Sequence, residues 1–190
     1  MKSFDKEKKE EAFLSVYDAF LSVEGENCEI AHDNFKEFRE KASNYKGVQI
    51  GVKAPNFEIE AQTGNYLYKL KSDYILLIFW ATWCPHCKEE LLKIQKLLDK
   101  NLVKLEKDGF TWKTIAISLD TDENQWRNFI AANNLTNWQH ISELNSWNDT
   151  TVKKYNIYAT PTMFLLDKDK IIIKKPTSAR ALELFFEEKK

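Results

Sequence analysis

The sequence predicts an α/β protein in which helices flank a mixed central sheet, preceded by an N-terminal helical extension. Two apolar runs, 74–81 and 114–119, are typical of strands buried on both faces. Between them, residues 88–107 place leucine and isoleucine at helical spacing. This strand–helix–strand order implies a parallel pair joined by a right-handed crossover. A final hairpin, 163–173, adds antiparallel strands, so the sheet is mixed.

The length, composition and charge of the chain limit the kinds of function that it can have. The chain has 190 residues, of which 43% are hydrophobic, enough for one core and an accessory piece. Its 28 basic and 29 acidic residues leave no positive excess, so we expect no nucleic-acid partner. The longest apolar run is well short of the ~20 residues that span a bilayer, so no membrane span is predicted in this chain. Residues 1–6 lack the apolar region of a secretory leader.

Residues 1–46 predict the helical extension. Aromatic and apolar residues recur at helical spacing on both sides of a turn at 25–27, and Cys28 lies at that turn. The two amphipathic helices either pack on the following domain or form an arm that binds a partner or dimerises. The second domain is predicted to occupy 47–190.

The elements of this domain follow from local patterns. Alternating residues predict an antiparallel hairpin of 56–60 with 66–70. Gly109 ends the long helix, and acids at 120–123 precede the next one. The rest is predicted as follows: a helix over 124–134, a less regular stretch over 138–147, a short helix over 150–155, strands over 163–166 and 171–173, and a closing helix over 179–188 capped by Ser178.

The motif Cys84-Pro85-His86-Cys87 stands where the first buried strand turns into the long helix. Free N–H groups and the positive end of the helix dipole stabilise a thiolate there. Cysteines three apart share one helical face and can form a disulfide with little backbone movement. Zinc would need four ligands, and no second paired motif exists in the sequence, so no metal site is predicted.

The segment 79–87 resembles the active site of the thioredoxin superfamily. With Ala54-Pro55-Asn56-Phe57 and Thr160-Pro161-Thr162, the chain resembles the TlpA/ResA-like branch of bacterial envelope thiol-disulfide oxidoreductases. The resemblance implies a thioredoxin-like domain, protein thiol or disulfide substrates, an upstream redox partner and no cofactor besides the cysteine pair. It also implies a role in cell redox homeostasis in the periplasm or cell envelope, with the cytoplasm as the alternative.

These observations assign roles to the site residues. Cys84, at the exposed helix end, is the predicted nucleophile, and Cys87, deeper in the helix, is the predicted resolving thiol. The resemblance implies that Glu90 transfers protons near the cysteines. It also implies that Pro161 is a cis-proline whose loop, with Thr160, receives substrate. Trp83 is predicted to shield the edge of the site and contact substrate.

Pro85 and His86 are predicted to modulate the couple. Proline suits the first helical turn, and a protonated His86 would favour the thiolate and make the disulfide more oxidising. We therefore expect a potential between those of thioredoxin and DsbA, while the direction of catalysis depends on the redox partner. One feature departs from thioredoxins: Ile78 stands where they carry a buried aspartate.

Two other function classes fit parts of the sequence. The pattern at 54–57 also resembles that of peroxiredoxin-like peroxidases. That class carries threonine three residues before its cysteine, where this chain has Ala81. A non-catalytic binding module with this fold would not need both Cys84 and Cys87, which are present.

Overall fold

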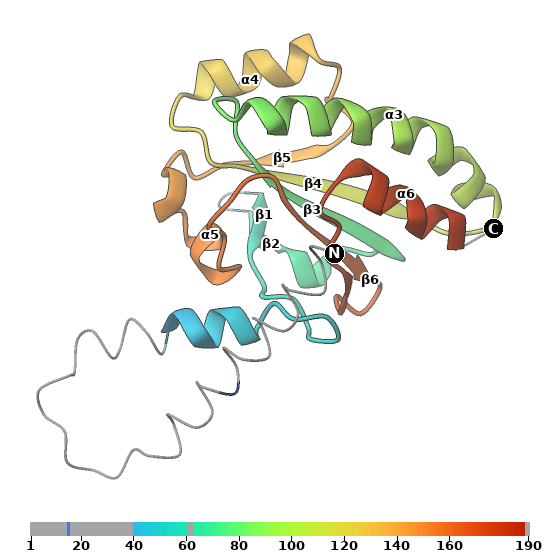
Figure 1. Ribbon diagram of the computed structural model, residues 1–190, viewed down its shortest axis with the longest axis horizontal. Coiled ribbons are helices and arrows are strands. Elements are labelled where there is room, and N and C mark those ends of the chain that lie inside the picture. The colour runs from blue at the N-terminus through green and yellow to red at the C-terminus, as the bar shows by residue number, and fades with distance from the viewer. Residues whose placement is uncertain (1–14, 16–39, 61–62, 189–190) are drawn as a thin grey trace, which may run out of the picture. The chain divides into compact units, whose positions relative to one another are not determined.

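The computed structural model describes residue 15 and residues 40–60 and 63–188 (Figure 1). The chain divides into two compact units, Met1–Lys46 and Gly47–Lys190, and each is considered by itself. In the first unit, residues 40–46 are helical. Cys28 and most of the helical pattern upstream lie outside the described residues, so the assignment of 1–46 as a helical extension stays a prediction.

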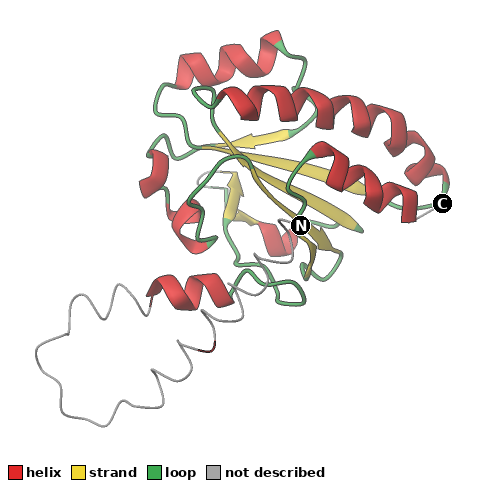
Figure 2. Ribbon diagram, viewed as in Figure 1, coloured by secondary structure: helices red, strands yellow, loops and turns green. Residues whose placement is uncertain are grey.

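The second unit is built on a five-stranded sheet in the order β5-β4-β3-β6-β7 (Figure 2). Its strands are β3 (Tyr74–Trp80), β4 (Trp112–Ser118), β5 (Gln139–Ile141), β6 (Thr162–Asp167) and β7 (Ile172–Lys174). Strand β3 pairs in parallel with β4 and antiparallel with β6. The mixed central sheet and its parallel β3–α3–β4 unit are therefore confirmed.

Helices and a small hairpin cover the two faces of this sheet (Figure 1). One face carries α3 (Pro85–Lys107), α4 (Glu123–Ala132) and α6 (Ala179–Glu188). The other face carries α5 (Thr150–Lys154) and the pair β1 (Glu58–Glu60) and β2 (Asn65–Tyr66). Since α3 and α4 follow successive parallel strands that step in the same direction, right-handed crossovers place both on one face.

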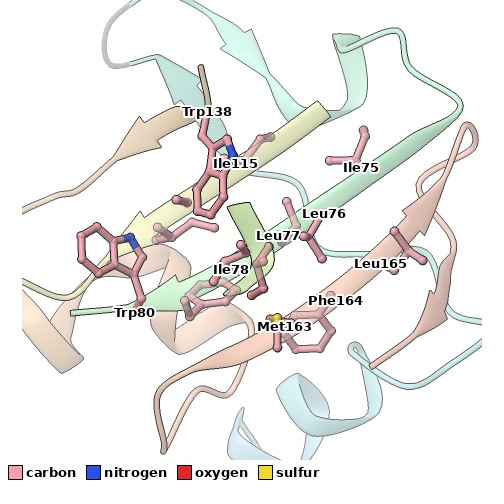
Figure 3. Close-up of a cluster of buried hydrophobic side chains, with 14 of the residues drawn as sticks. Ile75, Leu76, Leu77, Ile78, Trp80, Ile115, Trp138, Met163, Phe164 and Leu165 are labelled. Atoms are coloured by element: carbon pink, nitrogen blue, oxygen red, sulfur yellow. The ribbon is translucent and has the colours of Figure 1, made fainter. Parts of the chain in front are cut away.

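Strand β3 is buried along its whole length, which explains its continuous apolar sequence. Successive side chains point to opposite faces. The ring of Phe79 packs against Tyr155 and Phe164 on the side of α5, whereas Trp80 packs against Phe129 of α4. Figure 3 shows Trp80 and its neighbours along this strand, between the strands that flank it. Burial on both faces fixes the strand that carries the cysteine motif at its end.

Helix α3 begins directly after Cys84, and Pro85 occupies its first position. Its buried face is formed by Leu91, Ile94, Leu98 and Leu105, which lie on the predicted apolar stripe. The helix ends in a left-handed Gly109 at φ 83°, with the Phe110 N–H donating to the Leu105 carbonyl at 3.0 Å. The predicted stop signal is confirmed.

Two predictions for shorter elements were wrong in detail. The second half of the hairpin is a strand only over Asn65–Tyr66, followed by a 3-10 turn, η2 (Leu67–Lys69). The turn buries Leu67 completely and lets its N–H donate to the Phe57 carbonyl. The stretch predicted as less regular contains the edge strand β5 and a 3-10 turn, η3 (Ser146–Asn148). Strand β5 has three half-buried residues, too few for a period-2 signal.

Candidate active site at the end of the central strand

Cys84 caps the N-terminus of α3 with its own sulfur. The Cys87 N–H donates to Cys84 Sγ at 3.2 Å, so the sulfur satisfies one of the free donors of the first turn. The Cys84 thiol in turn donates to the Thr160 carbonyl at 3.6 Å. Two segments that are 76 residues apart in sequence therefore meet at one sulfur.

The sheet register brings Thr160 to this position. Strand β6 runs antiparallel to β3, and Phe79 is paired with Thr162. The start of β6 and the loop before it therefore lie beside the end of β3, where the motif begins. The Thr160–Pro161 peptide bond is cis, as predicted from the resemblance.

Hydrogen bonds favour the ionised form of Cys84. Burial raises the pKa of its thiol, but hydrogen bonds from the side chains of Cys87 and Thr160 and from the N–H groups of Cys87 and His86 outweigh this effect. The pKa of Cys84 therefore lies below its ordinary value of 9.0. A thiolate is the reactive form of cysteine, so these contacts raise the reactive fraction of Cys84.

Cys87 has the opposite environment. It is fully buried, whereas Cys84 keeps 8% of its surface exposed. Burial, reinforced by the hydrogen bond with Cys84, raises the pKa of Cys87 to about 12. The two sulfurs thus differ in both access and acidity: Cys84 keeps some exposed surface and has a lowered pKa, whereas Cys87 is fully buried and its pKa is raised.

A buried carboxylate from the acidic run that was predicted to cap the next helix holds the loop before Cys84. Asp120 is 1% exposed and follows β4, next to the end of β3. The Thr82 N–H donates to both of its oxygens, at 3.1 and 3.0 Å, and the Thr82 hydroxyl donates at 2.6 Å. The Ser118 hydroxyl adds a bond at 2.7 Å. The cap of α4 is instead Asp122, which accepts from the Gln125 N–H.

The other predicted site residues surround the motif unequally. Pro85 and His86 are exposed on the first turn of α3. Trp83 is 48% exposed, and its ring lies 6.1 Å from that of Trp147, centroid to centroid. Trp147 belongs to η3, in the stretch where the sequence analysis identified no functional residue. Its signal in the sequence was an aromatic residue among polar, uncharged neighbours.

Glu90 is 4% exposed and its two carboxylate oxygens have partners of their own. Lys93 Nζ donates to Oε1 at 2.9 Å, and the Ala179 N–H at the start of α6 donates to Oε2 at 2.7 Å. Burial raises the pKa of the Glu90 carboxyl, but Lys93, the Ala179 N–H and the charge of His86 outweigh this effect, so the pKa lies below its ordinary value of 4.5. Glu90 therefore ties α3 to α6 as a carboxylate. Its role in proton transfer stays a prediction.

Within residues 40–60 and 63–188, no group of three or more histidine, cysteine, aspartate or glutamate side chains is arranged to hold a metal ion. None of the helices in the described part of the chain is both long enough and apolar enough to cross a membrane.

Comparison with known proteins places the chain in a family. The sequence model of a family described as thioredoxin-like matches residues 72–172, which run from just before β3 to the start of β7. The chain belongs to the thioredoxin-like family. The matched segment includes the cysteine motif and the cis-proline loop, so the family assignment rests on the same residues that build the site.

Curated relatives of this thioredoxin-like chain include thiol-disulfide oxidoreductases. A thiol-disulfide oxidoreductase ResA of Bacillus cereus is 31% identical over 130 residues, which cover 67% of this chain and 69% of ResA. The thioredoxin-like protein YneN of Bacillus subtilis is 30% identical over 128 residues, covering 66% of this chain and 70% of YneN. The predicted resemblance to the ResA-like branch is confirmed.

Solved structures of similar fold also include thiol-disulfide oxidoreductases. A domain of a possible thiol-disulfide isomerase from Cytophaga hutchinsonii has a TM-score of 0.60 at 30% identity and covers 74% of this chain and 92% of its own. A thiol-disulfide oxidoreductase from Bacteroides fragilis has a TM-score of 0.60 at 26% identity and covers 73% and 99%. The thioredoxin-like chain is thus a thiol-disulfide oxidoreductase, as the motif predicted, and its direction of catalysis is left open.

Proposed function

We propose that the protein exchanges its Cys84–Cys87 dithiol with disulfides of other proteins, with Cys84 as the attacking thiolate and Cys87 as the resolving thiol. The observation that carries this proposal is the asymmetry of the pair. Cys84 is partly exposed with a pKa below 9.0, while Cys87 is fully buried with a pKa of about 12. Of the two thiols, Cys84 is the more accessible and has the larger ionised fraction at neutral pH.

The proposed reaction has two exchanges. The Cys84 thiolate attacks one sulfur of a substrate disulfide, forming a mixed disulfide and releasing the second substrate sulfur as a thiolate. Cys87 then loses its proton to solvent or a nearby base and attacks Cys84 Sγ. This step closes the Cys84–Cys87 disulfide and frees the first substrate sulfur. Two electrons pass from the dithiol to the substrate. A reduced partner, whose thiolate attacks the Cys84–Cys87 disulfide, would run the same steps in reverse.

The loop of Thr160 and Pro161 is the proposed place for substrate. The Thr160 carbonyl already lies 3.6 Å from Cys84 Sγ, so a chain bound along this loop would present its sulfur to the nucleophile. Trp83, exposed beside Cys84, is proposed to contact the same segment.

The two residues between the cysteines set the proposed potential. His86 lies on the first turn of α3, and its N–H helps to lower the pKa of Cys84. We infer a potential between about −270 mV for thioredoxin and about −120 mV for DsbA. Equilibration of the pair in glutathione buffers measures it, and a value at or outside either limit would contradict the assignment of Pro85 and His86 as modulating residues.

The finer predictions of compartment and upstream partner rest on the resemblance to the ResA-like branch. We propose the periplasm or cell envelope as the site of action, with an upstream redox partner that renews one form of the cysteine pair. Fractionation of the cells that produce the protein tests the compartment: recovery with the cytoplasmic fraction alone would overturn it.

A trapping experiment tests the roles of the two cysteines. The Cys87→Ser variant is expected to accumulate a mixed disulfide with insulin, because the second exchange is blocked. The Cys84→Ser variant is expected to form none and to lose insulin reduction in dithiothreitol. If Cys84→Ser retained the activity of the unmodified chain, the nucleophile assignment would be wrong.

A peroxidase is the alternative that a simple assay separates. Reduced protein that consumes hydrogen peroxide at a rate far above that of free thiols, and leaves insulin intact, would favour a peroxiredoxin-like function instead. Residue 81, where that class carries threonine, is a buried alanine here.

A further inference from the structure

The rim around Cys84 combines exposed aromatic rings with three chain segments that lack acidic, lysine and arginine side chains; the exposed His86 and Lys88 follow the first of them. Trp83 and Trp147 are 48% and 41% exposed, and Tyr158, on the loop that contacts Cys84, is more exposed still. Large aromatic side chains exposed together are unusual on a surface that binds nothing. Because Trp83 is bonded to Cys84 and Tyr158 is two residues from Thr160, this surface is continuous with the proposed reaction site.

Three chain segments form this rim: residues 81–85, 144–148 and 155–163. Together they contain no aspartate, glutamate, lysine or arginine, although 30% of the chain is charged. The first and third meet at Cys84 Sγ, and the first and second meet through the ring contact of Trp83 with Trp147. A charged group brought onto this rim would lose water without gaining an ionic partner from these segments.

The position of Trp147 is fixed by its backbone. Asp149, 1% exposed, accepts from the N–H groups of Thr151 and Val152 at 2.7 and 3.1 Å, and so anchors the end of η3 to α5. Leu144 and Ser146 adopt left-handed φ angles of 54° and 53°, which are uncommon for residues other than glycine. The loop therefore places the Trp147 ring beside Trp83, with 41% of the Trp147 surface exposed.

We propose that Trp147, together with Trp83, is a specificity-determining surface that favours an extended substrate segment with aromatic or aliphatic residues next to its cysteine. This inference rests on the proposed function and names the class of substrate for it. Contact between aromatic rings changes an equilibrium or rate constant by a factor of roughly two to ten. A glutamate at the same place loses its hydration and finds no ionic partner in the three segments, so we expect it to react more slowly.

Short peptides test the surface directly. Each peptide holds one cysteine as a mixed disulfide with thionitrobenzoate, and the two neighbouring residues are both Phe, both Ser or both Glu. The Cys84 thiolate attacks the peptide sulfur and the sulfur–sulfur bond breaks. Thionitrobenzoate, whose thiol is the more acidic, leaves with the electron pair and gives a colour change. Cys87 then closes the disulfide and releases the reduced peptide.

The unmodified chain is expected to react about fivefold faster with the Phe-flanked than with the Ser-flanked peptide, and slowest with the Glu-flanked one. Trp147→Ala should bring the Phe-to-Ser ratio to below about two, and Trp147→Phe should keep most of it, since a ring remains. Phe110→Ala is the matched control. Phe110 is 40% exposed and its ring lies 5.8 Å from that of Tyr74, but it stands beyond the far end of α3, about 35 Å from Cys84.

The outcomes separate this inference from the proposed function. Equal rates with the Phe- and Ser-flanked peptides, or a ratio lowered as much by Phe110→Ala as by Trp147→Ala, would overturn the specificity surface and leave the thiol exchange intact. A Cys84→Ser variant that released thionitrobenzoate as fast as the unmodified chain would overturn the proposed function itself.

Discussion

Replacement of Asp120 by alanine should destabilise the fold through the loop that carries the cysteine motif. The carboxylate is 1% exposed and accepts the Thr82 N–H, the Thr82 hydroxyl and the Ser118 hydroxyl. Alanine leaves all three donors without this acceptor. A buried donor left unsatisfied costs about 1–3 kcal/mol. The hydroxyls can rotate toward other acceptors but the backbone N–H cannot, so we expect a loss of about 3 kcal/mol.

Urea unfolding followed by tryptophan fluorescence measures this loss as a change in the midpoint at unchanged slope. Asp122→Ala is the matched control. Asp122 lies two residues away in the same loop, caps α4 from an exposed position and should cost only about 1 kcal/mol. Asp120→Asn should fall between the two, because one amide oxygen still accepts while the NH₂ group faces donors. If Asp120→Ala cost no more than Asp122→Ala, the buried network would not hold the loop.

Two further predictions concern the ionised groups of the site. In a Cys28→Ser background at pH 7, the pKa limits of 9.0 and about 12 make the thiolate fraction of Cys84 at least about 1,000 times that of Cys87. The more acidic thiolate is also the weaker nucleophile, which reduces this advantage by about 30-fold. Iodoacetamide should therefore label Cys84 at least about 30-fold faster than Cys87, and the labelling rate of Cys84 should reach half its maximum below pH 9. Comparable labelling of Cys87 would refute the asymmetry. Glu90→Gln should cost about 1–2 kcal/mol at neutral pH, because the amide keeps one acceptor oxygen and turns an NH₂ group toward the second donor. Since the folded pKa of Glu90 is lowered, this penalty should shrink as pH falls through that pKa, and a constant penalty would contradict the carboxylate link. A slower second exchange in the same variant, with Cys84 labelling unchanged, would support its role in proton transfer.

The parts of the fold that could be predicted are those in which burial of apolar side chains alone determines the sequence pattern. Strand β3 is buried on both faces, so every residue is apolar and the run stands out. Helix α3 is long, amphipathic, begins with Pro85 and ends at Gly109, so pattern and caps agree. The cysteine motif was found because it stands between these two well-marked elements.

The parts that could not be predicted depend on tertiary contacts. Strand β5 is three residues long and forms because β4 offers it a free edge, a fact that its own residues do not encode. The turn η2 replaces a predicted strand because the buried site for Leu67 is created by the rest of the domain. In both places packing against neighbouring elements, rather than the local alternation of apolar and polar residues, decided the secondary structure.

The role of Asp120 was missed although a signal existed. Asp120 and Asp122 stand in one acidic run, and capping explained both equally well from sequence alone. The parallel pairing of Trp80 with Ser118 separates them, since it places Asp120 beside Thr82 at the same edge of the sheet. A polar residue directly after a buried strand, next to the strand that carries the motif, was the clue.

The reactivity of Cys84 is a property of the sheet register. Its sulfur contacts α3, which follows β3, and the Thr160 loop, which precedes β6. The pairing of Phe79 with Thr162 that aligns these two ends also places Phe79 against Phe164 in the core. A slip of β6 by one residue would turn Phe164 out of that core and move Thr160 away from the sulfur at the same time. The packing that stabilises the domain therefore also sets the geometry that lowers the pKa of Cys84.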